Sequence, residues 1–210
     1  MLKIENAETF GWEAAIRGMR SPKNSWDKSD SCWSSPNENG TDKPMYIIGE
    51  NDLKLMHTLA AAGQDHGKFL RMIHVQLDVT APLYWHKEAD QYKVGTVTDS
   101  CSTMHKIHAK EFTLDDFSHE HLYSPLHDLK PTVDLLNMYR ERFLETKDKE
   151  DWWQLIQLLP SSYNQRRTWD LNYAVLRNIY HARRNHKIDE WHTLCDWIET
   201  LPYAKELICG

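Results

Sequence analysis

The strongest constraint on the fold is a series of amphipathic segments in the C-terminal half of this 210-residue chain, with prolines at Pro131, Pro160 and Pro202 near their ends. The first segment begins at Pro131, and Val133, Leu136 and Phe143 follow at helical spacing. Proline suits the first turn of a helix because that turn has no partner for an N–H group. Similar segments lie over about 150–159, 168–184 and 188–199. This half of the chain is therefore predicted to be helical.

The N-terminal half is predicted to add a strand to further helices. Ile73, Val75, Leu77 and Val79 alternate with polar side chains, which is the period of a half-buried strand. The other expected elements are helices over 7–20, over 53–62 and from Pro82 to about Tyr92, and a loop or short strand over 94–106. We therefore expect one α+β domain over residues 1–210, with a small sheet and a helical majority.

A polar segment at about residues 21–45 interrupts this pattern and is rich in Ser, Asp, Asn and Pro. It is longer than most connections within a compact domain. It is therefore either a disordered insertion or a functional loop. Trp26 and Trp33 favour an ordered loop, because solvated linkers rarely contain tryptophan.

Composition limits the class of ligand. Nine Trp and nine Tyr suit a helical core, an oligomer interface, or a pocket that stacks on ring-shaped ligands. The formal net charge is −6, and the densest basic stretch, 177–187, is short. Nucleic acid is a disfavoured partner, because duplex-binding proteins usually carry a basic face. A small anionic ligand held by a few arginines remains compatible with this charge.

Neither a membrane span nor export is expected. No stretch approaches the about 18 consecutive apolar residues of a membrane helix, and the first residues do not resemble a signal peptide. The four cysteines are scattered along the chain, at Cys32, Cys101, Cys195 and Cys209. This spacing predicts reduced thiols in a cytoplasmic protein.

A cluster of histidines within residues 105–127 raises the question of a metal site. His105 and His108, and also His119 and His121, have spacings that metal ligands can adopt. However, the chain has twelve histidines, so such pairs arise easily by chance, and the His-Glu-x-x-His motif is absent. We expect no metal site and interpret these residues as solvated loop histidines or nucleotide contacts.

The segment over 168–184 carries polar residues on an otherwise apolar helical surface. Asn172, Asn178 and Arg183 lie among Leu and Ile at helical spacing. Buried amide and guanidinium groups need hydrogen-bond partners. This surface therefore faces either a protein partner or a polar ligand.

The same segment carries a family resemblance. Leu159-Pro160, Trp169, Asn172, Asn178 and Arg183 together resemble the C-terminal signature of the flavin-dependent thymidylate synthases (ThyX). The resemblance implies a ThyX-like fold with a small antiparallel sheet. It also implies that Asn172 and Asn178 contact FAD and that Arg183 contacts the nucleotide. Family members are homotetramers with sites at subunit interfaces, which we expect here too.

Other stretches follow the order of that family. The Gly63 to His66 segment resembles the family's Gly-His segment, which implies a cofactor contact for His66. Residues 82–104 lie where the family has its Arg-His-Arg-x-x-Ser-x-Asn-Glu-x-Ser-x-Arg motif. The resemblance extends loosely over residues 7–205.

The departures from the family pattern concern its arginines. Tyr92-Lys93-Val94 stands in place of Arg-His-Arg, and Met104 in place of the last arginine. Ile156 and Ala174 replace two more. Each lost hydrogen bond to a charged group is worth roughly 1.5–3 kcal/mol. Compared with the family that the chain resembles, the loss of these arginines therefore implies weak dUMP binding at best.

The remaining side chains in this region still suit a nucleotide. Aromatic rings for stacking, hydroxyl groups and cations are supplied by Tyr84, Trp85, Tyr92, Lys93, Ser100, Ser102 and Arg183. The alternative is a β-branched strand whose aromatic residues belong to the core. No residue is assigned a catalytic role.

We expect a nucleotide-binding protein on a thymidylate synthase scaffold that has lost thymidylate synthesis. If the gene is viral, from a phage or prophage, such a protein could act as a nucleotide sponge for a signalling nucleotide. The alternatives are an active flavin-dependent thymidylate synthase, which uses FAD, NADPH and methylenetetrahydrofolate, or another nucleotide-modifying enzyme. Fold alone does not decide among them.

Overall fold

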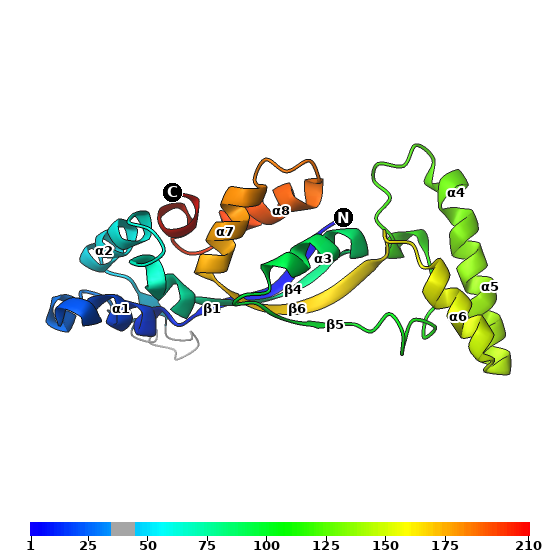
Figure 1. Cartoon of the computed structure of the whole chain (residues 1–210), viewed down its shortest axis with the longest axis horizontal. Coiled ribbons are helices and arrows are strands. Elements are labelled where there is room, and N and C mark those ends of the chain that lie inside the picture. The colour runs from blue at the N-terminus through cyan, green and yellow to red at the C-terminus, as the bar shows by residue number, and fades with distance from the viewer. Residues whose placement is uncertain (35–44) are drawn as a thin grey trace. The chain divides into compact units, whose positions relative to one another are not determined.

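A computed structural model describes residues 1–34 and 45–210 (Figure 1). The part of the predicted polar segment at 35–44 lies outside the described residues. The strands are β1 (Lys3–Phe10), β2 (Cys32–Trp33), β3 (Tyr46–Ile47), β4 (His74–Pro82), β5 (Val97–Ser100) and β6 (Asn164–Asn172). The helices are α1 (Trp12–Arg20), α2 (Glu50–Ala61), α3 (Leu83–Ala89), α4 (Pro125–Asp128), α5 (Lys130–Thr146), α6 (Lys149–Leu158), α7 (Tyr173–Arg183) and α8 (Asp189–Ile198).

The chain divides into two compact units. Unit 1 comprises Met1–Asn6, Leu77–Gln91 and Thr98–Trp169, and unit 2 comprises Ala7–Gln76, Tyr92–Val97 and Asp170–Gly210. A small antiparallel sheet has the strand order β1-β4-β6-β5, and β2 pairs with β3 in a separate ribbon. The predicted α+β class, with a small sheet and a helical majority, is confirmed. That residues 1–210 act as one domain stays a prediction.

Strand β4 confirms the alternation seen in the sequence. Val75, Leu77 and Val79 are buried, and Ile73, directly before the strand, is buried as well. The residues between them face away from this apolar layer and make polar contacts. The period of two therefore identified both the strand and its buried face.

Unit 1 has a core of its own. The apolar cluster joins α5 and α6 to the loops before them and consists of Ile107, Phe112, Phe117, Leu129, Val133, Leu136 and Leu155. Pro131 lies in the first turn of α5, as predicted. Asp148 caps α6 by accepting a hydrogen bond from the backbone N–H of Glu150 at 3.0 Å. Both helices thus form where the proline and capping signals place them.

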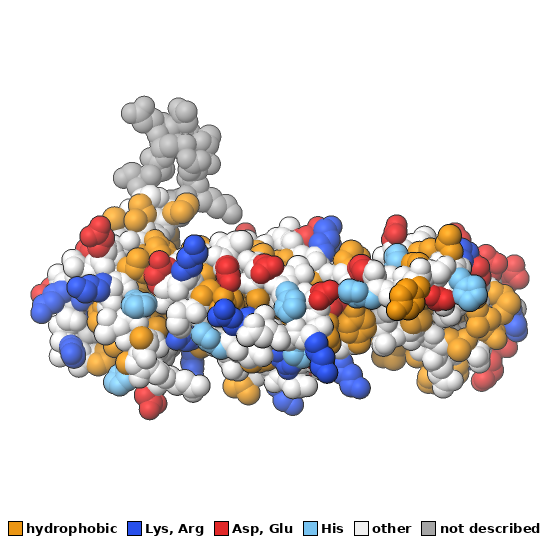
Figure 2. All heavy atoms as spheres, turned by 90° about the horizontal axis from the view of Figure 1, so that it is seen from above, with side chains coloured by type: hydrophobic (Ala, Val, Ile, Leu, Met, Phe, Trp, Pro, Cys, Tyr) orange, Lys and Arg blue, Asp and Glu red, His pale blue; other side chains and the backbone are white. Residues whose placement is uncertain are grey.

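Several large apolar side chains are exposed on α4–α6 in unit 1. Leu126 is 72% exposed, Met138 42% and Trp153 38%. Figure 2 shows hydrophobic side chains gathered with acidic ones around these helices. Large apolar side chains exposed together are typical of surfaces that contact another protein.

The helix predicted over 7–20 begins later, at Trp12, because residues 7–10 belong to β1. Gly11 separates the two elements with a φ of +91°. A Cβ atom added to Gly11 would lie 2.0 Å from the carbonyl oxygen of Met72, so no other residue fits there. The prediction was wrong for residues 7–10.

The helix predicted over 168–184 also begins later, at Tyr173, because Asn164–Asn172 form β6. Gln165, Trp169 and Leu171 are buried at positions two or four apart, which fits a strand. The apolar residues here satisfy the period of a strand and of a helix equally well. Pairing with neighbouring strands decides between them, and this pairing is not visible in a single segment.

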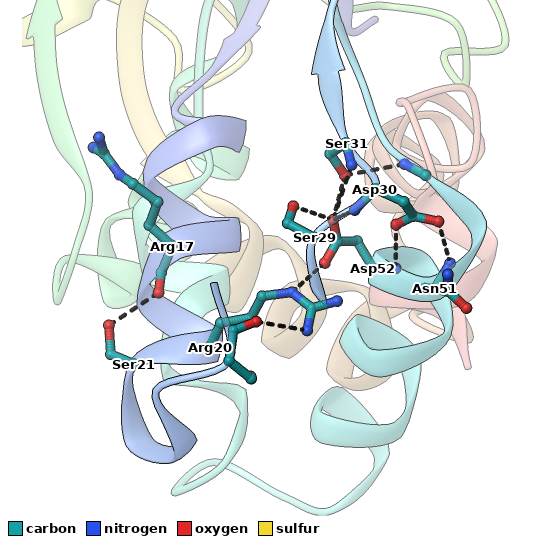
Figure 3. A network of polar contacts seen from close by, with 10 residues as sticks. Arg17, Arg20, Ser21, Ser29, Asp30, Ser31, Asn51 and Asp52 are labelled. Carbon is teal, nitrogen blue, oxygen red and sulfur yellow. Dashed lines mark hydrogen bonds and ion pairs between the residues drawn. The ribbon is translucent and has the colours of Figure 1, made fainter. Parts of the chain in front are cut away.

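The described part of the polar segment is ordered around Asp52 in unit 2 (Figure 3). One carboxylate oxygen of Asp52 accepts hydrogen bonds from the hydroxyls of Ser29 (2.6 Å) and Ser31 (2.7 Å) and from the backbone N–H of Asp30 (3.2 Å) and Ser31 (3.1 Å). The other accepts from Nε of Arg20 at 2.6 Å. These hydrogen bonds attach residues 29–31 to the first turn of α2.

Candidate functional site

A cavity of about 580 Å³ lies within unit 2. Its walls come from the end of α2, the turn over residues 63–67, residues 94–95 and α7. The polar side chains that line it are Gln64, Arg71, Asn172, Arg177, Asn178 and His181. Its volume lies in the range of about 300–1,000 Å³ that is typical of small-molecule sites.

One face of α7 supplies most of these groups. Ala174, Arg177, Asn178 and His181 all line the cavity, and their spacing is i, i+3, i+4 and i+7 of a helix. The sequence contained this stripe, but a helix assumed to begin at residue 168 draws attention to Asn172 and Arg183 instead. Arg177 and His181 were therefore missed as site residues.

Asn172 holds the start of this helix and also lines the cavity. Its side-chain oxygen accepts a hydrogen bond from the backbone N–H of Val175 at 3.1 Å, which is an N-cap. Its side-chain nitrogen donates to the carbonyl oxygen of Gly95 at 3.4 Å. The side chain is 6% exposed. Each end of the Asn172 amide therefore makes one hydrogen bond within the chain and can make one more to a ligand.

The cavity favours an anion. Arg71, Arg177 and His181 line it, and no aspartate or glutamate does so among the described residues. Arg177 is anchored because its two terminal nitrogens donate to the carbonyl oxygens of Leu207 (2.9 Å) and Gly210 (2.8 Å). Arg71 is exposed, and arginine binds phosphate oxygens well. Phosphate groups would meet attraction here without opposing carboxylates.

Arg183 lies at the end of α7 and does not line the cavity. Its Nε donates to the hydroxyl of Tyr92 at 2.8 Å. Its guanidinium carbon lies 4.9 Å from the centre of the Trp191 ring and 5.6 Å from that of Tyr92. The structure thus brings together Arg183 and Tyr92, two predicted site residues, in a contact with each other.

The remaining candidates are more dispersed. Lys93 and His66 are exposed in unit 2. His66 lies between Gln64 and Gly67, which line the cavity, but does not line it itself. Asn178 does line it and is exposed to solvent. Of the three predicted cofactor contacts, Asn172 and Asn178 share the cavity.

Four candidates belong to unit 1. Trp85 is fully buried, and its ring stacks on Trp169 with centroids 5.6 Å apart. It has no open face for a ligand in this chain, so we leave it out of the proposed site. The hydroxyl of Ser102 accepts hydrogen bonds from two following backbone N–H groups, which makes it a turn residue. Tyr84 is partly buried and Ser100 is exposed at the end of β5.

Two further features concern metals and membranes. Within residues 1–34 and 45–210, no three His, Cys, Asp or Glu side chains converge as metal ligands would. The ring Nδ1 of His119 instead contacts the carbonyl oxygen of Phe117 at 2.8 Å, and His108 packs on Phe143. None of the helices in those described ranges is both long and apolar enough to cross a membrane.

Comparisons with known proteins bear on the fold alone. No family model and no curated protein matches the sequence. The flavin-dependent thymidylate synthase ThyX from Helicobacter pylori, complexed with FAD and dUMP, matches with a TM-score of 0.69 at 15% identity, over 98% of this chain and 97% of that one. This chain has a ThyX-like fold. A second structure of that enzyme with FAD and dUMP gives 0.70 at 14% identity, over 99% and 97% of the two chains.

A third solved structure is named for the methylation of UMP as well as dUMP. The UMP/dUMP methylase PolB from Streptomyces cacaoi, bound with 5-Br dUMP, matches with a TM-score of 0.62 at 13% identity, over 100% of this chain and 94% of that one. The predicted ThyX-like fold is thus confirmed. At such identities, the assignment of residues to substrate or cofactor has to come from this chain's own geometry.

Proposed function

We propose that this chain binds a nucleotide in the unit 2 cavity and does not synthesise thymidylate. The observation that carries the proposal is the lining of the cavity. Arg71 and Arg177 supply positive charge, Gln64, Asn172 and Asn178 supply amides, His181 supplies an imidazole ring, and no carboxylate opposes them among the described residues. Cations for phosphate and amides for a base or ribose are what nucleotide recognition requires.

The loss of synthesis is inferred from the missing arginines. Ala174 lines the cavity where the family resemblance leads us to expect an arginine. Tyr92, which stands in the degenerate Arg-His-Arg motif, contacts Arg183 rather than the cavity. A methyl group cannot replace charge-assisted hydrogen bonds to a phosphate. A nucleotide can still bind after this loss. Catalysis is affected more, because the reaction requires two reactants to be held in precise alignment, and that alignment is more sensitive than binding to the loss of a contact.

FAD is compatible with the same cavity. Asn172, Asn178, Arg71 and Arg177 would hold its phosphates and polar edges, and the absence of lining carboxylates among the described residues removes repulsion. When bound, a flavin would supply hydride-transfer chemistry. FAD is therefore one of two probes in the experiment below, alongside dUMP.

Sequestration is the biological role that fits a site that binds a nucleotide without converting it to a product. If the gene is viral, a signalling nucleotide of the host would be captured and released unchanged. An enzyme would instead leave a processed product. The identity and state of the bound molecule therefore distinguish these roles.

The test begins with mass spectrometry of small molecules released when the purified protein is denatured. A nucleotide recovered unchanged supports the proposal, and the yellow absorbance of an oxidised flavin would identify the ligand as FAD. Titration calorimetry with FAD and with dUMP follows. No released nucleotide and no saturable binding of either probe would refute nucleotide binding. Thymidylate formed from dUMP, methylenetetrahydrofolate, NADPH and FAD would refute the loss of synthesis.

A matched pair of variants locates the site. Arg71 lines the cavity and is exposed, so Arg71→Gln removes a charge with little effect on folding. We expect it to weaken binding by about tenfold, which corresponds to one charge-assisted hydrogen bond. Arg17 is an exposed arginine of the same unit, 3.7 Å from Glu13, and Arg17→Gln should leave affinity unchanged. Equal effects of the two variants would place the ligand elsewhere.

A further inference from the structure

We infer that Tyr92 is a positioning residue, which holds one wall of the unit 2 cavity in place through Arg183. The wall is the segment over residues 92–95, called the strap below. The effect of the Tyr92–Arg183 contact on ligand binding rests on the proposed function. Its effect on the strap in the free protein does not, and the two effects are tested separately.

The first end of the strap is fixed at the C-terminal end of α7. The Tyr92 hydroxyl accepts a hydrogen bond from Nε of Arg183 at 2.8 Å. The guanidinium group of Arg183 also lies against the ring of Trp191, which is fully buried. The Tyr92 and Trp191 rings meet edge to face, with centroids 5.9 Å apart. Tyr92 is thus held by one charged hydrogen bond and by aromatic packing.

The second end of the strap is fixed at the N-terminal end of α7. The carbonyl oxygen of Gly95 accepts from the side chain of Asn172 at 3.4 Å, and Gly95 has a φ of +83°. A Cβ atom added to Gly95 would lie 3.0 Å from the Asn172 side-chain nitrogen. The absence of a side chain at Gly95 therefore permits this close approach.

The strap reaches both ends of α7 only with the help of two long side chains. Asn172 and Arg183 are separated by 11 residue steps of helix, a rise of about 16 Å. The backbone from Tyr92 to Gly95 spans at most about 11 Å even when fully extended. The long side chains of Tyr92 and Arg183 cover the difference. Loss of their contact would release one end of the strap.

The strap matters because its middle lines the cavity. Val94 and Gly95 are cavity residues, whereas neither Tyr92 nor Arg183 is one. Arg183 therefore acts on the cavity through the strap. The family resemblance implied a direct nucleotide contact for Arg183, so the two assignments differ in what they predict for double variants.

The first experiment is hydrogen exchange on the free protein, followed by mass spectrometry of peptides that contain residues 92–97. Tyr92→Phe keeps the ring and removes the hydroxyl. We expect exchange in this segment to become about tenfold faster, since opening of the strap controls it. Tyr180→Phe is the matched control, because it removes a tyrosine hydrogen bond from the same helix, to Glu199 at 2.6 Å. Unchanged exchange in Tyr92→Phe, or equal acceleration in both variants, would overturn the inference.

The second experiment measures affinity for FAD and dUMP in Tyr92→Phe, Arg183→Lys and the double variant. We expect each single variant to weaken binding of the probe at least fivefold, mainly through faster dissociation. The double variant should lose no more affinity than the single variant that binds the probe less tightly. Losses that multiply in the double variant would mean that Arg183 touches the ligand directly, which would overturn the inference. If the unaltered protein binds neither probe, the proposed function fails, and hydrogen exchange alone decides about the strap.

Discussion

Replacement of Asp52 by alanine tests how the polar segment is held to the rest of unit 2. Asp52 is fully buried and Arg20 is 5% exposed. The variant removes the carboxylate and with it the five hydrogen bonds that it accepts (Figure 3). Arg20 then keeps its hydrogen bond to the carbonyl oxygen of Ser25, at 3.2 Å. Breaking a buried ion pair on one side costs about 3–5 kcal/mol, because the remaining charge stays desolvated.

The assay is urea unfolding followed by tryptophan fluorescence, with the free energy of unfolding compared at equal m-value. Asp27→Ala is the control, since Asp27 is an exposed carboxylate in the same segment, and it should change stability by less than about 0.5 kcal/mol. The double variant Arg20→Met/Asp52→Leu should recover most of the loss, because it leaves no buried charge behind. A loss below about 1 kcal/mol in Asp52→Ala would refute this account of the network.

The ionisation of Asp52 gives the same network a pH dependence. Burial by itself would raise the pKa of Asp52, but hydrogen bonds from Ser29, Ser31 and Arg20 lower it below its ordinary value. A carboxyl group with a lowered pKa in the folded state stabilises the fold above its unfolded-state pKa. This contribution is lost as the pH falls through the folded-state pKa. Asp52→Ala should therefore flatten the acid limb of the stability profile.

Three further predictions concern other parts of the chain. Burial lowers the pKa of His86 to about 4, so between about pH 6.5 and 4 the unfolded chain binds a proton that the folded protein does not, and the fold loses about 3 kcal/mol of stability. Urea unfolding of His86→Gln at about pH 7.5 and 4.5 should therefore show a shallower pH dependence of the free energy of unfolding than the unaltered protein. An unchanged pH dependence would contradict the assignment. Gly95→Ala should lower the thermal unfolding temperature more than Gly63→Ala, because both positions have positive φ but, of the two, Gly95 alone has neighbours within 4 Å of an added Cβ atom. Equal decreases in the unfolding temperature would argue against the close approach of Gly95 to Asn172. Light scattering should give a homotetramer of the 24.8 kDa chain, with α4–α6 as a candidate contact surface, and a monomer would count against interface sites.

Sequence patterns located most elements because their signals are local. Pro131 marked α5, and the alternation over 73–79 marked β4 and its buried face. The resemblance carried by Leu159-Pro160, Trp169 and Asn172 also implied the ThyX-like fold, which is confirmed. Where the local signal was ambiguous, as in residues 7–10 and 168–172, strand pairing decided the outcome.

The sequence by itself contained the polar residues that lie on α7, and the replacement of the arginines expected from the family resemblance stays a prediction. Only the tertiary structure decided which of those groups share a cavity. Arg71 and Arg177 are far apart in sequence, and no periodic pattern links a turn before β4 to a face of α7. The structure also paired Arg183 with Tyr92 across 91 positions. Such contacts depend on how elements pack, so the residue types were readable from the sequence but their partners were not.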